Sequence, residues 1–206
     1  MERTFSAFKN LIERQSLTLE QLGFLPGASV AELDEFEAII GRPLPAGLRY
    51  FLSQTNGQTE DGMLCLPGCA CARLLSCAEM IQTWRFECKD AAKEGSMDFA
   101  HRYQDEDRVR SVLHSPDRII VAHEVGIVVF ALDYLPGPAG KAGQVITDVS
   151  ECEYMVLAPS FESYFDKVVR LMQHQTLTIT ESDDYECWIL GHQGDLMDPE
   201  DFVRAT

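Results

Sequence analysis

Basic side chains are scarce in this chain. Its 206 residues include 17 lysines and arginines against 33 aspartates and glutamates, which leaves a formal net charge of −16. Phosphates and anionic lipids repel such a protein, so the charge argues against nucleic-acid and membrane partners. The same charge permits fast association with a basic protein, although acidity also serves solubility alone.

Long hydrophobic runs are missing as well. The longest, Val125 to Leu132, is far too short to cross a bilayer. The first ten residues, MERTFSAFKN, carry charges early and do not resemble a signal peptide. We therefore expect a soluble, cytoplasmic protein. Its seven cysteines should then remain thiols, and an odd number cannot all pair within one molecule.

Sequence patterns of catalysis are also absent. We find no G-x-S-x-G elbow, no phosphate-binding loop and no dinucleotide fingerprint. His123-Glu124 resembles the start of an HExxH helix, but Ile127 stands where the second histidine belongs. Carboxylates are numerous, yet no pair is set apart for acid–base chemistry. The sequence predicts no enzymatic activity, no catalytic residue and no cofactor.

Four cysteines close together invite a metal hypothesis. Cys65, Cys69, Cys71 and Cys77 follow the spacing C-x3-C-x-C-x5-C, which lacks the paired CxxC units of a typical zinc site. Several lie among Leu, Ala and Pro, where a thiol packs as a small hydrophobic group. We predict no metal site, with zinc at these cysteines as the lesser alternative.

The stretch from Leu25 to Gly57 predicts two helices in succession. Ser29 and Glu32 have the spacing of a capping box, and Gly41 supplies a stop signal. Pro45 suits the first position of the second helix, and Asn56-Gly57 is expected to end it. The apolar stripes of the two helices contain Leu33, Phe36, Ile40, Leu48, Phe51 and Leu52.

Further elements follow from the same periodicities. Helices are predicted around residues 5–12, 76–92 and 160–174. Strands are predicted at residues 62–66, 118–122, 125–133, 144–148 and 153–157. The two strands between residues 118 and 133 are almost continuously apolar, as in central strands covered on at least one side. The segment LPGPAGKAG at residues 135–143 is expected to connect strands.

Two blocks of this sequence resemble the SMI1/KNR4 family, also called SUKH. The first is the helix pair from Leu25 to Gly57, with its LP step and NG turn. The second runs from Gly143 to Phe165, with a GxVxxxD strand, a charged turn, a second strand and a helix entered through APSF. The order and separation of the blocks carry the resemblance. The segment 65–106 and the C-terminal end match no part of the pattern.

The resemblance implies an α+β fold with a SUKH-like central, mainly antiparallel β-sheet flanked by helices. Residues 1–24 are expected to form an N-terminal helical segment, residues 25–175 the SMI1/KNR4-like domain, and residues 176–206 an acidic C-terminal extension packed on that domain. Many bacterial members are immunity proteins, so the resemblance implies a stoichiometric complex with a cognate toxin of nuclease or other nucleotide-modifying type. A regulatory or scaffold module that binds an endogenous partner is the alternative.

Two clusters of carboxylates are the candidate partner-binding residues. From Glu181 onward the chain has eight carboxylates and one arginine, together with aromatic side chains. Aromatic anchors surrounded by charge are typical of interaction hot spots, although a solvated surface would look the same in sequence. The predicted binding residues are Asp105, Glu106, Asp107, Asp183, Asp184, Tyr185, Glu186 and Trp188.

Overall fold

The computed structural model describes residues 1–59, 61, 63–69, 72–94, 107–110, 112, 114–124, 128–150, 153–182 and 187–206. The helices are α1 (Glu2–Glu13), α2 (Val30–Ile40), α3 (Ala46–Gln54), α4 (Cys77–Glu94), α5 (Phe161–Gln173) and α6 (Pro199–Arg204). The strands are β1 (Phe24–Pro26), β2 (Thr55–Gln58), β3 (Leu64–Cys65), β4 (Arg73–Leu74), β5 (Arg118–Glu124), β6 (Val128–Asp133), β7 (Gln144–Ser150), β8 (Glu153–Ala158), β9 (Thr178–Glu181) and β10 (Trp188–Gly191).

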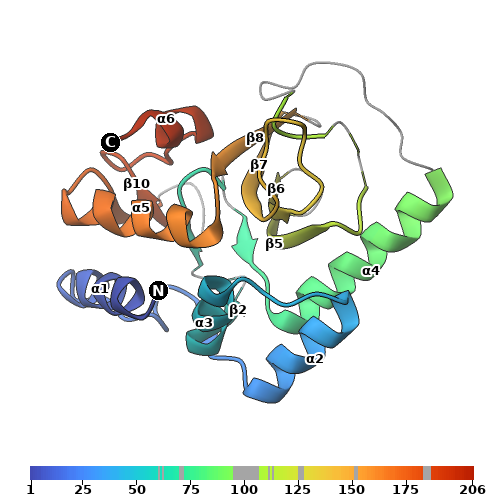
Figure 1. The fold of residues 1–206 in the computed structure, drawn as a ribbon. Helices are drawn as coiled ribbons and strands as arrows, with labels where there is room; N and C mark the ends of the chain where they lie inside the picture. Colours follow the sequence, from blue (N-terminus) through green and yellow to red (C-terminus); the bar gives the residue numbers. More distant parts are fainter. Residues whose placement is uncertain are drawn as a thin grey trace.

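The central element is a five-stranded antiparallel sheet with the order β4-β5-β6-β7-β8 (Figure 1). Four consecutive residues of β5, from Ile119 to Ala122, are all buried, so both faces of this strand are covered. Such coverage explains the nearly continuous apolar run in the sequence. Together with the flanking helices, the sheet confirms the predicted α+β architecture. In the described residues, no helix is both long enough and apolar enough to span a membrane.

Helix α2 begins and ends at the residues that the sequence predicts. The Ser29 side chain accepts a hydrogen bond from the Glu32 amide at 3.2 Å, and the Glu32 carboxylate accepts one from the Ser29 amide at 2.8 Å. Gly41 ends the helix in the left-handed conformation, with φ of 72°. Local side-chain chemistry therefore sets both ends of this helix.

The structure corrects the predicted limits of the second helix. Pro45 is the N-cap of α3 rather than its first helical residue, and the helix ends at Gln54. Asn56-Gly57 does not end the helix but lies inside β2, which pairs with β1. The β-branched Thr55 takes an extended conformation at the C-cap, so the chain passes directly from helix to strand.

The Asn56-Gly57 pair instead joins β2 to the start of α4. The Asn56 side chain accepts a hydrogen bond from the Cys77 amide at 2.8 Å. Gly57 has φ of 86°, and a Cβ there would lie 2.6 Å from the Ser76 nitrogen. Positive φ and close approach of the backbone both require glycine at this position.

A second capping box, which the sequence analysis did not identify, begins α4. Glu79 accepts a hydrogen bond from the Ser76 amide at 2.8 Å, and Ser76 Oγ accepts one from the Glu79 amide at 3.3 Å. Arg73 also donates to Glu79 at 2.7 Å. Burial acts to raise the pKa of Glu79, but the hydrogen bonds from Arg73 and Ser76 outweigh it and lower the pKa to about 2.

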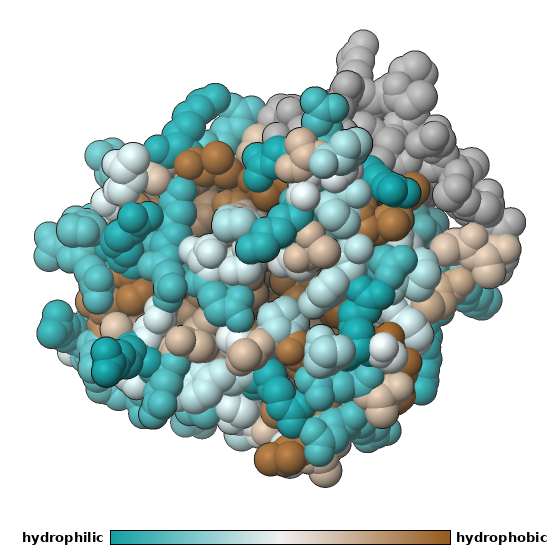
Figure 2. All heavy atoms as spheres, in the orientation of Figure 1, coloured by the Kyte–Doolittle hydropathy of each residue, from teal (hydrophilic) through white to brown (hydrophobic). Residues whose placement is uncertain are grey.

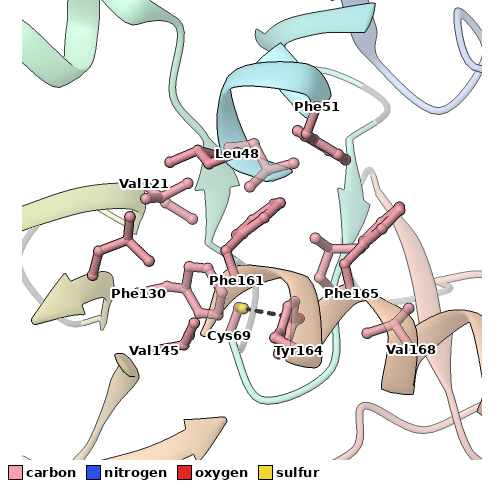
Figure 3. Close-up of a cluster of buried hydrophobic side chains, with 14 of the residues drawn as sticks. Leu48, Phe51, Cys69, Val121, Phe130, Val145, Phe161, Tyr164, Phe165 and Val168 are labelled. Atoms are coloured by element: carbon pink, nitrogen blue, oxygen red, sulfur yellow. Dashed lines mark hydrogen bonds between the residues drawn. The ribbon is translucent and has the colours of Figure 1, made fainter. Parts of the chain in front are cut away.

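Aromatic side chains join α1, α3 and α5. The Phe51 ring lies 5.4 Å from that of Phe161 and 5.2 Å from that of Phe165, with edge-to-face geometry. Phe8 of α1 contacts Phe165 from another side, with ring centroids 5.2 Å apart. Figure 3 shows Phe51 of α3 facing Phe161 and Phe165 of α5. Ser160 caps α5 as predicted and thereby fixes where these rings enter the core.

The C-terminal residues add a sheet and a helix to this core. Strand β10 pairs in antiparallel fashion with β9 and in parallel fashion with β3. Phe202 of α6 is fully buried, with its ring 5.2 Å from that of Tyr164. Lys167 lies over the Phe202 ring at 4.8 Å and donates a hydrogen bond to the Val203 carbonyl at 3.0 Å. Residues after α5 thus contribute directly to the hydrophobic core.

Replacing the central ring of the aromatic cluster should strongly destabilise the protein. We expect Phe51→Ala to lower the free energy of unfolding by about 3–5 kcal/mol, because a buried ring is lost and a cavity remains. Phe86→Ala is the matched control, since 55% of Phe86 is exposed, and it should cost within about 0.5 kcal/mol. Denaturant unfolding of both variants measures the difference. Equal costs would contradict the packing described.

Acid should remove the stabilisation that Glu79 provides. Because the folded-state pKa of about 2 lies below the ordinary value of 4.5, the contribution is complete above pH 4.5 and disappears as the pH falls through 2. The Glu79 side chain is partly exposed, so we expect about 1–2 kcal/mol after screening by solvent. Glu79→Gln keeps a capping oxygen without the charge. The stability difference between wild type and this variant should shrink as the pH falls and vanish below the folded-state pKa of about 2, and a pH-independent difference would contradict the assignment.

Candidate functional site

The backbone that follows the first predicted acidic cluster is held by neighbouring parts of the fold. We call the described residues 107–110 and 112 the seat of this cluster. Asp107 is exposed, and its carbonyl oxygen accepts a hydrogen bond from the Ala139 amide at 2.7 Å. The Arg108 carbonyl accepts hydrogen bonds from the Gly137 amide at 2.9 Å and from the Gln144 side chain at 2.7 Å. The backbone after Asp107 therefore lies against the connection between β6 and β7.

The glycines of that connection are needed for this close approach. A Cβ at Gly137 would overlap the Asp107 carbonyl, and a Cβ at Gly140 would overlap the Arg108 carbonyl. The LPGPAGKAG segment, which the sequence predicts only as a connection, thus has a second role as a support for residues 107 and 108. Larger residues at either glycine would push the two backbones apart.

A buried arginine holds the next part of the same segment. Arg118, at the start of β5, is only 2% exposed. Its two terminal nitrogens donate hydrogen bonds of 2.6 Å to the carbonyls of Val112 and Arg110. Its Nε lies 3.7 Å from the Asp133 carboxylate, and its guanidinium lies 4.5 Å from the centre of the Tyr154 ring. Since both charges are buried, each depends on the other for compensation.

The segment then meets the outer face of α4 at an exposed aromatic side chain. The Phe86 ring lies 6.1 Å from the His114 ring in edge-to-face geometry. His114 Nδ1 is 3.2 Å from the carboxylate of the buried Glu87. The Trp84 indole donates a hydrogen bond to the Pro116 carbonyl at 2.8 Å. Helix α4 and residues 114–116 therefore form one surface, which we call the α4 ledge.

Exposed apolar side chains are few and scattered. Among the described residues the large ones are Val30 on α2, Phe86 on α4 and Val203 on α6. Figure 2 shows a face dominated by hydrophilic side chains, on which apolar atoms form small separate patches. Phe86 differs from the other two because it is aromatic and the His114 ring packs against it.

The matching family model is described as SMI1 / KNR4 family (SUKH-1), and the match covers residues 27–167. This span is more than half of the chain. The chain belongs to the SMI1/KNR4 family. A search of curated proteins found no match.

The SMI1/KNR4 match places the α4 ledge inside the family domain. The matched residues include α2, α3, α4 and the five-stranded sheet, and they end within α5. Helix α1 and the elements β9, β10 and α6 lie outside the match. The family is typically one of non-enzymatic immunity or interaction domains. In this SMI1/KNR4 chain, binding surfaces are therefore the sites of interest.

The structure describes two of the eight predicted binding residues. Asp107 is exposed, and its backbone lies against the connection between β6 and β7. Trp188 is half-buried in β10, where it pairs with Leu64 and Glu181 and packs against the core. The other six predicted residues lie outside the described part of the chain, namely Asp105, Glu106, Asp183, Asp184, Tyr185 and Glu186.

Sequence reasoning missed Phe86 and Arg118. The predicted apolar face of the α4 helix contains Met80, Ile81 and Trp84, and Phe86 falls off that stripe. Phe86 could have been found in the sequence as an aromatic residue that lies away from the apolar face of its helix. Arg118 gives no such signal, because a single arginine at the first position of a strand looks like an exposed residue until the fold places it next to Asp133.

The described cysteines of the SMI1/KNR4 chain lie in different surroundings. Cys65 Sγ is 3.5 Å from Cys187 Sγ, and Cys69 Sγ is 3.6 Å from the Tyr164 hydroxyl. Burial raises the pKa of Cys69 to about 12, so this thiol stays protonated. Within the described residues no three Cys, His, Asp or Glu side chains converge as a metal site would require. Cys71 lies outside the described residues.

Removing the Arg118 charge should release the seat of the acidic segment. We expect Arg118→Met to lower the free energy of unfolding by about 3–5 kcal/mol, because Asp133 would remain buried without its partner. Amides of Gly137 and Ala139 should also exchange faster than in the wild type, because they donate to residues 107 and 108 of the segment whose Arg110 and Val112 carbonyls lose their hydrogen bonds to Arg118. Arg110→Met is the matched control, because the Arg110 side chain is exposed, and it should cost within about 0.5 kcal/mol. Denaturant unfolding measures the free energy, and hydrogen exchange measures the amide protection. Unchanged exchange in Arg118→Met would show that Arg118 does not hold this backbone.

Proposed function

We propose that this chain is an immunity protein that neutralises a cognate toxin by forming a stoichiometric complex with it. Membership of the SMI1/KNR4 family carries this proposal, since many bacterial members act in this way. The net charge of −16 supports a basic partner. A nuclease or another nucleotide-modifying toxin fits, because enzymes that bind nucleic acid carry positive surface charge.

Inhibition would be steric and electrostatic, with no chemistry on the immunity protein. The acidic clusters would steer the toxin and occupy the surface that it uses for its phosphate-bearing substrate. Charge alone mainly raises the association rate, so tight binding needs desolvated anchors. Phe86 on the α4 ledge is the best placed of the described residues to serve as such an anchor, because its ring is exposed and supported by His114.

The fixed backbone of residues 107–110 and 112 would add to affinity. A segment whose backbone is already held by Arg118 and by the β6–β7 connection loses little conformational freedom when a partner binds it. The Asp105–Asp107 cluster would then be attached to the domain through a fixed backbone at Asp107. We propose this cluster, Phe86 and the cluster at residues 183–186 as the steering and anchoring groups.

Capture of the partner tests the proposed function directly. Tagged full-length chain is used to capture proteins from the native organism, and the captured partner is then expressed alone and together with this chain. We expect the partner to arrest growth when alone and growth to recover on co-expression. A partner that is harmless alone would overturn the immunity proposal in favour of the regulatory or scaffold alternative.

Neutralising each acidic cluster in turn tests whether that cluster speeds association with the partner. We expect the triple change D105N/E106Q/D107N, and separately D183N/D184N/E186Q, to lower the association rate for the captured partner roughly tenfold at low salt. The control E2Q/E20Q/E35Q removes the same charge from exposed positions on the N-terminal helices and loop. Stopped-flow association measures all three. An equal effect of the control would show that net charge matters and the clusters do not.

The same complex tests the anchor on the α4 ledge. Phe86→Ala should raise the dissociation rate roughly tenfold and leave the association rate nearly unchanged, because an anchor acts after docking. Val203→Ala on α6 is the matched control, since it also removes an exposed apolar side chain. A dissociation rate that Phe86→Ala leaves unchanged would remove the α4 ledge from the interface.

A further inference from the structure

Two buried thiols from distant parts of the chain face each other. Cys65 belongs to β3 and Cys187 immediately precedes β10, and their sulfur atoms are 3.5 Å apart across 122 positions of sequence. Both side chains belong to a small satellite cluster with Ile189, separate from the main core. The parallel pairing of β10 with β3, through Trp188↔Leu64 and Ile189↔Cys65, holds them in this position.

We propose that Cys65 and Cys187 form a reversible disulfide that fastens the C-terminal sheet to the SMI1/KNR4 domain under oxidising conditions. Sulfur atoms in a disulfide are about 2 Å apart, so the thiols need only a small further approach. The other described thiols have different neighbours. Cys69 contacts the Tyr164 hydroxyl, and Cys88 is half-buried on α4. Cys77 is buried at the start of α4, so among the described cysteines the geometry favours the pair Cys65 and Cys187.

The oxidant is a low-molecular-weight disulfide of the glutathione class. The Cys187 thiolate attacks one sulfur of this disulfide, whose S–S bond breaks and releases one small thiolate, which takes up the proton that Cys187 lost. The Cys65 thiolate then attacks Cys187 Sγ in the mixed disulfide and releases the second small thiol, which takes the Cys65 proton. Two protein thiols are oxidised and one small disulfide is reduced to two thiols.

The link would stabilise the fold where it is held by few backbone contacts. Strand β3 has two residues, and its ladder with β10 spans two residue pairs. A disulfide there closes a loop of 122 positions, and long loops gain most in the chain-entropy description. We expect the oxidised protein to melt higher by on the order of 5 to 10 °C.

Equilibration of the purified full-length chain in buffers of increasing ratio of oxidised to reduced glutathione tests the proposal. Remaining thiols are alkylated at each ratio, and the protein is digested for peptide mass mapping. We expect a linked pair of peptides containing Cys65 and Cys187, with loss of two hydrogen atoms and a raised melting temperature. Cys65→Ser and Cys187→Ser should each abolish the link and the shift, whereas Cys88→Ser should keep both.

Peptide mapping of the wild-type chain detects the link even where a serine variant folds poorly. Only glutathione adducts, or a link between other cysteines, at the most oxidising ratio would overturn it. So would a Cys65–Cys187 link that forms only after the chain has been unfolded in denaturant. The link is independent of the proposed function, because its formation requires no partner.

Discussion

The fold depends on the contact between α3 and α5, which brings together sequence blocks more than a hundred residues apart. The Gly47 amide donates a hydrogen bond of 2.6 Å to the Glu162 carboxylate, across 115 positions. A Cβ at Gly47 would overlap the Glu162 side chain, which would have to turn away and so lose this hydrogen bond. Beside this bond, Phe51 packs on Phe161 and Phe165. A directional polar contact sets the register, and the rings supply most of the burial.

The same helix α5 connects the sheet to the C-terminal elements. Tyr164 donates a hydrogen bond to the Pro67 carbonyl at 2.8 Å, and its ring lies 4.9 Å from that of Phe130 in β6. Figure 3 shows Tyr164 facing Cys69, from the segment that follows β3. Phe202 of α6 covers Tyr164 from the other side. One helix thus fixes the sheet, the turn after β3 and the C-terminal helix, which explains why residues beyond the matched family span take part in the core.

Local features of this structure could be predicted from the sequence, because nearby residues determine them. The capping box at Ser29, the stop at Gly41 and the cap at Ser160 are examples. Asn56-Gly57 was misplaced for a physical reason: positive φ suits a helix end and a strand junction equally, and only the approach of Ser76 distinguishes them.

Features that depend on distant residues could not be predicted. The parallel pairing of β10 with β3 joins strands more than 120 residues apart, and nothing in either strand specifies its partner. The candidate site shows the same division. Acidic clusters are visible as composition, whereas the burial of Arg118 depends on Asp133, Arg110 and Val112 meeting around it.

The residues that hold the fold together differ from the residues that a partner can touch. The aromatic contacts of α3 and α5 are buried, so a partner cannot touch them. Next to the α4 ledge, the backbone of residues 107–110 and 112 is held by a buried guanidinium, by close contact with two glycines and by the buried side chain of Val109. The exposed side chains of Asp107 and Arg110 can therefore change without loss of the backbone geometry, whereas the side chain of Val109 is buried in the core. A surface of this kind can acquire affinity for a new partner through substitutions that leave the fold intact, because the groups that position it and the groups that face solvent are different residues.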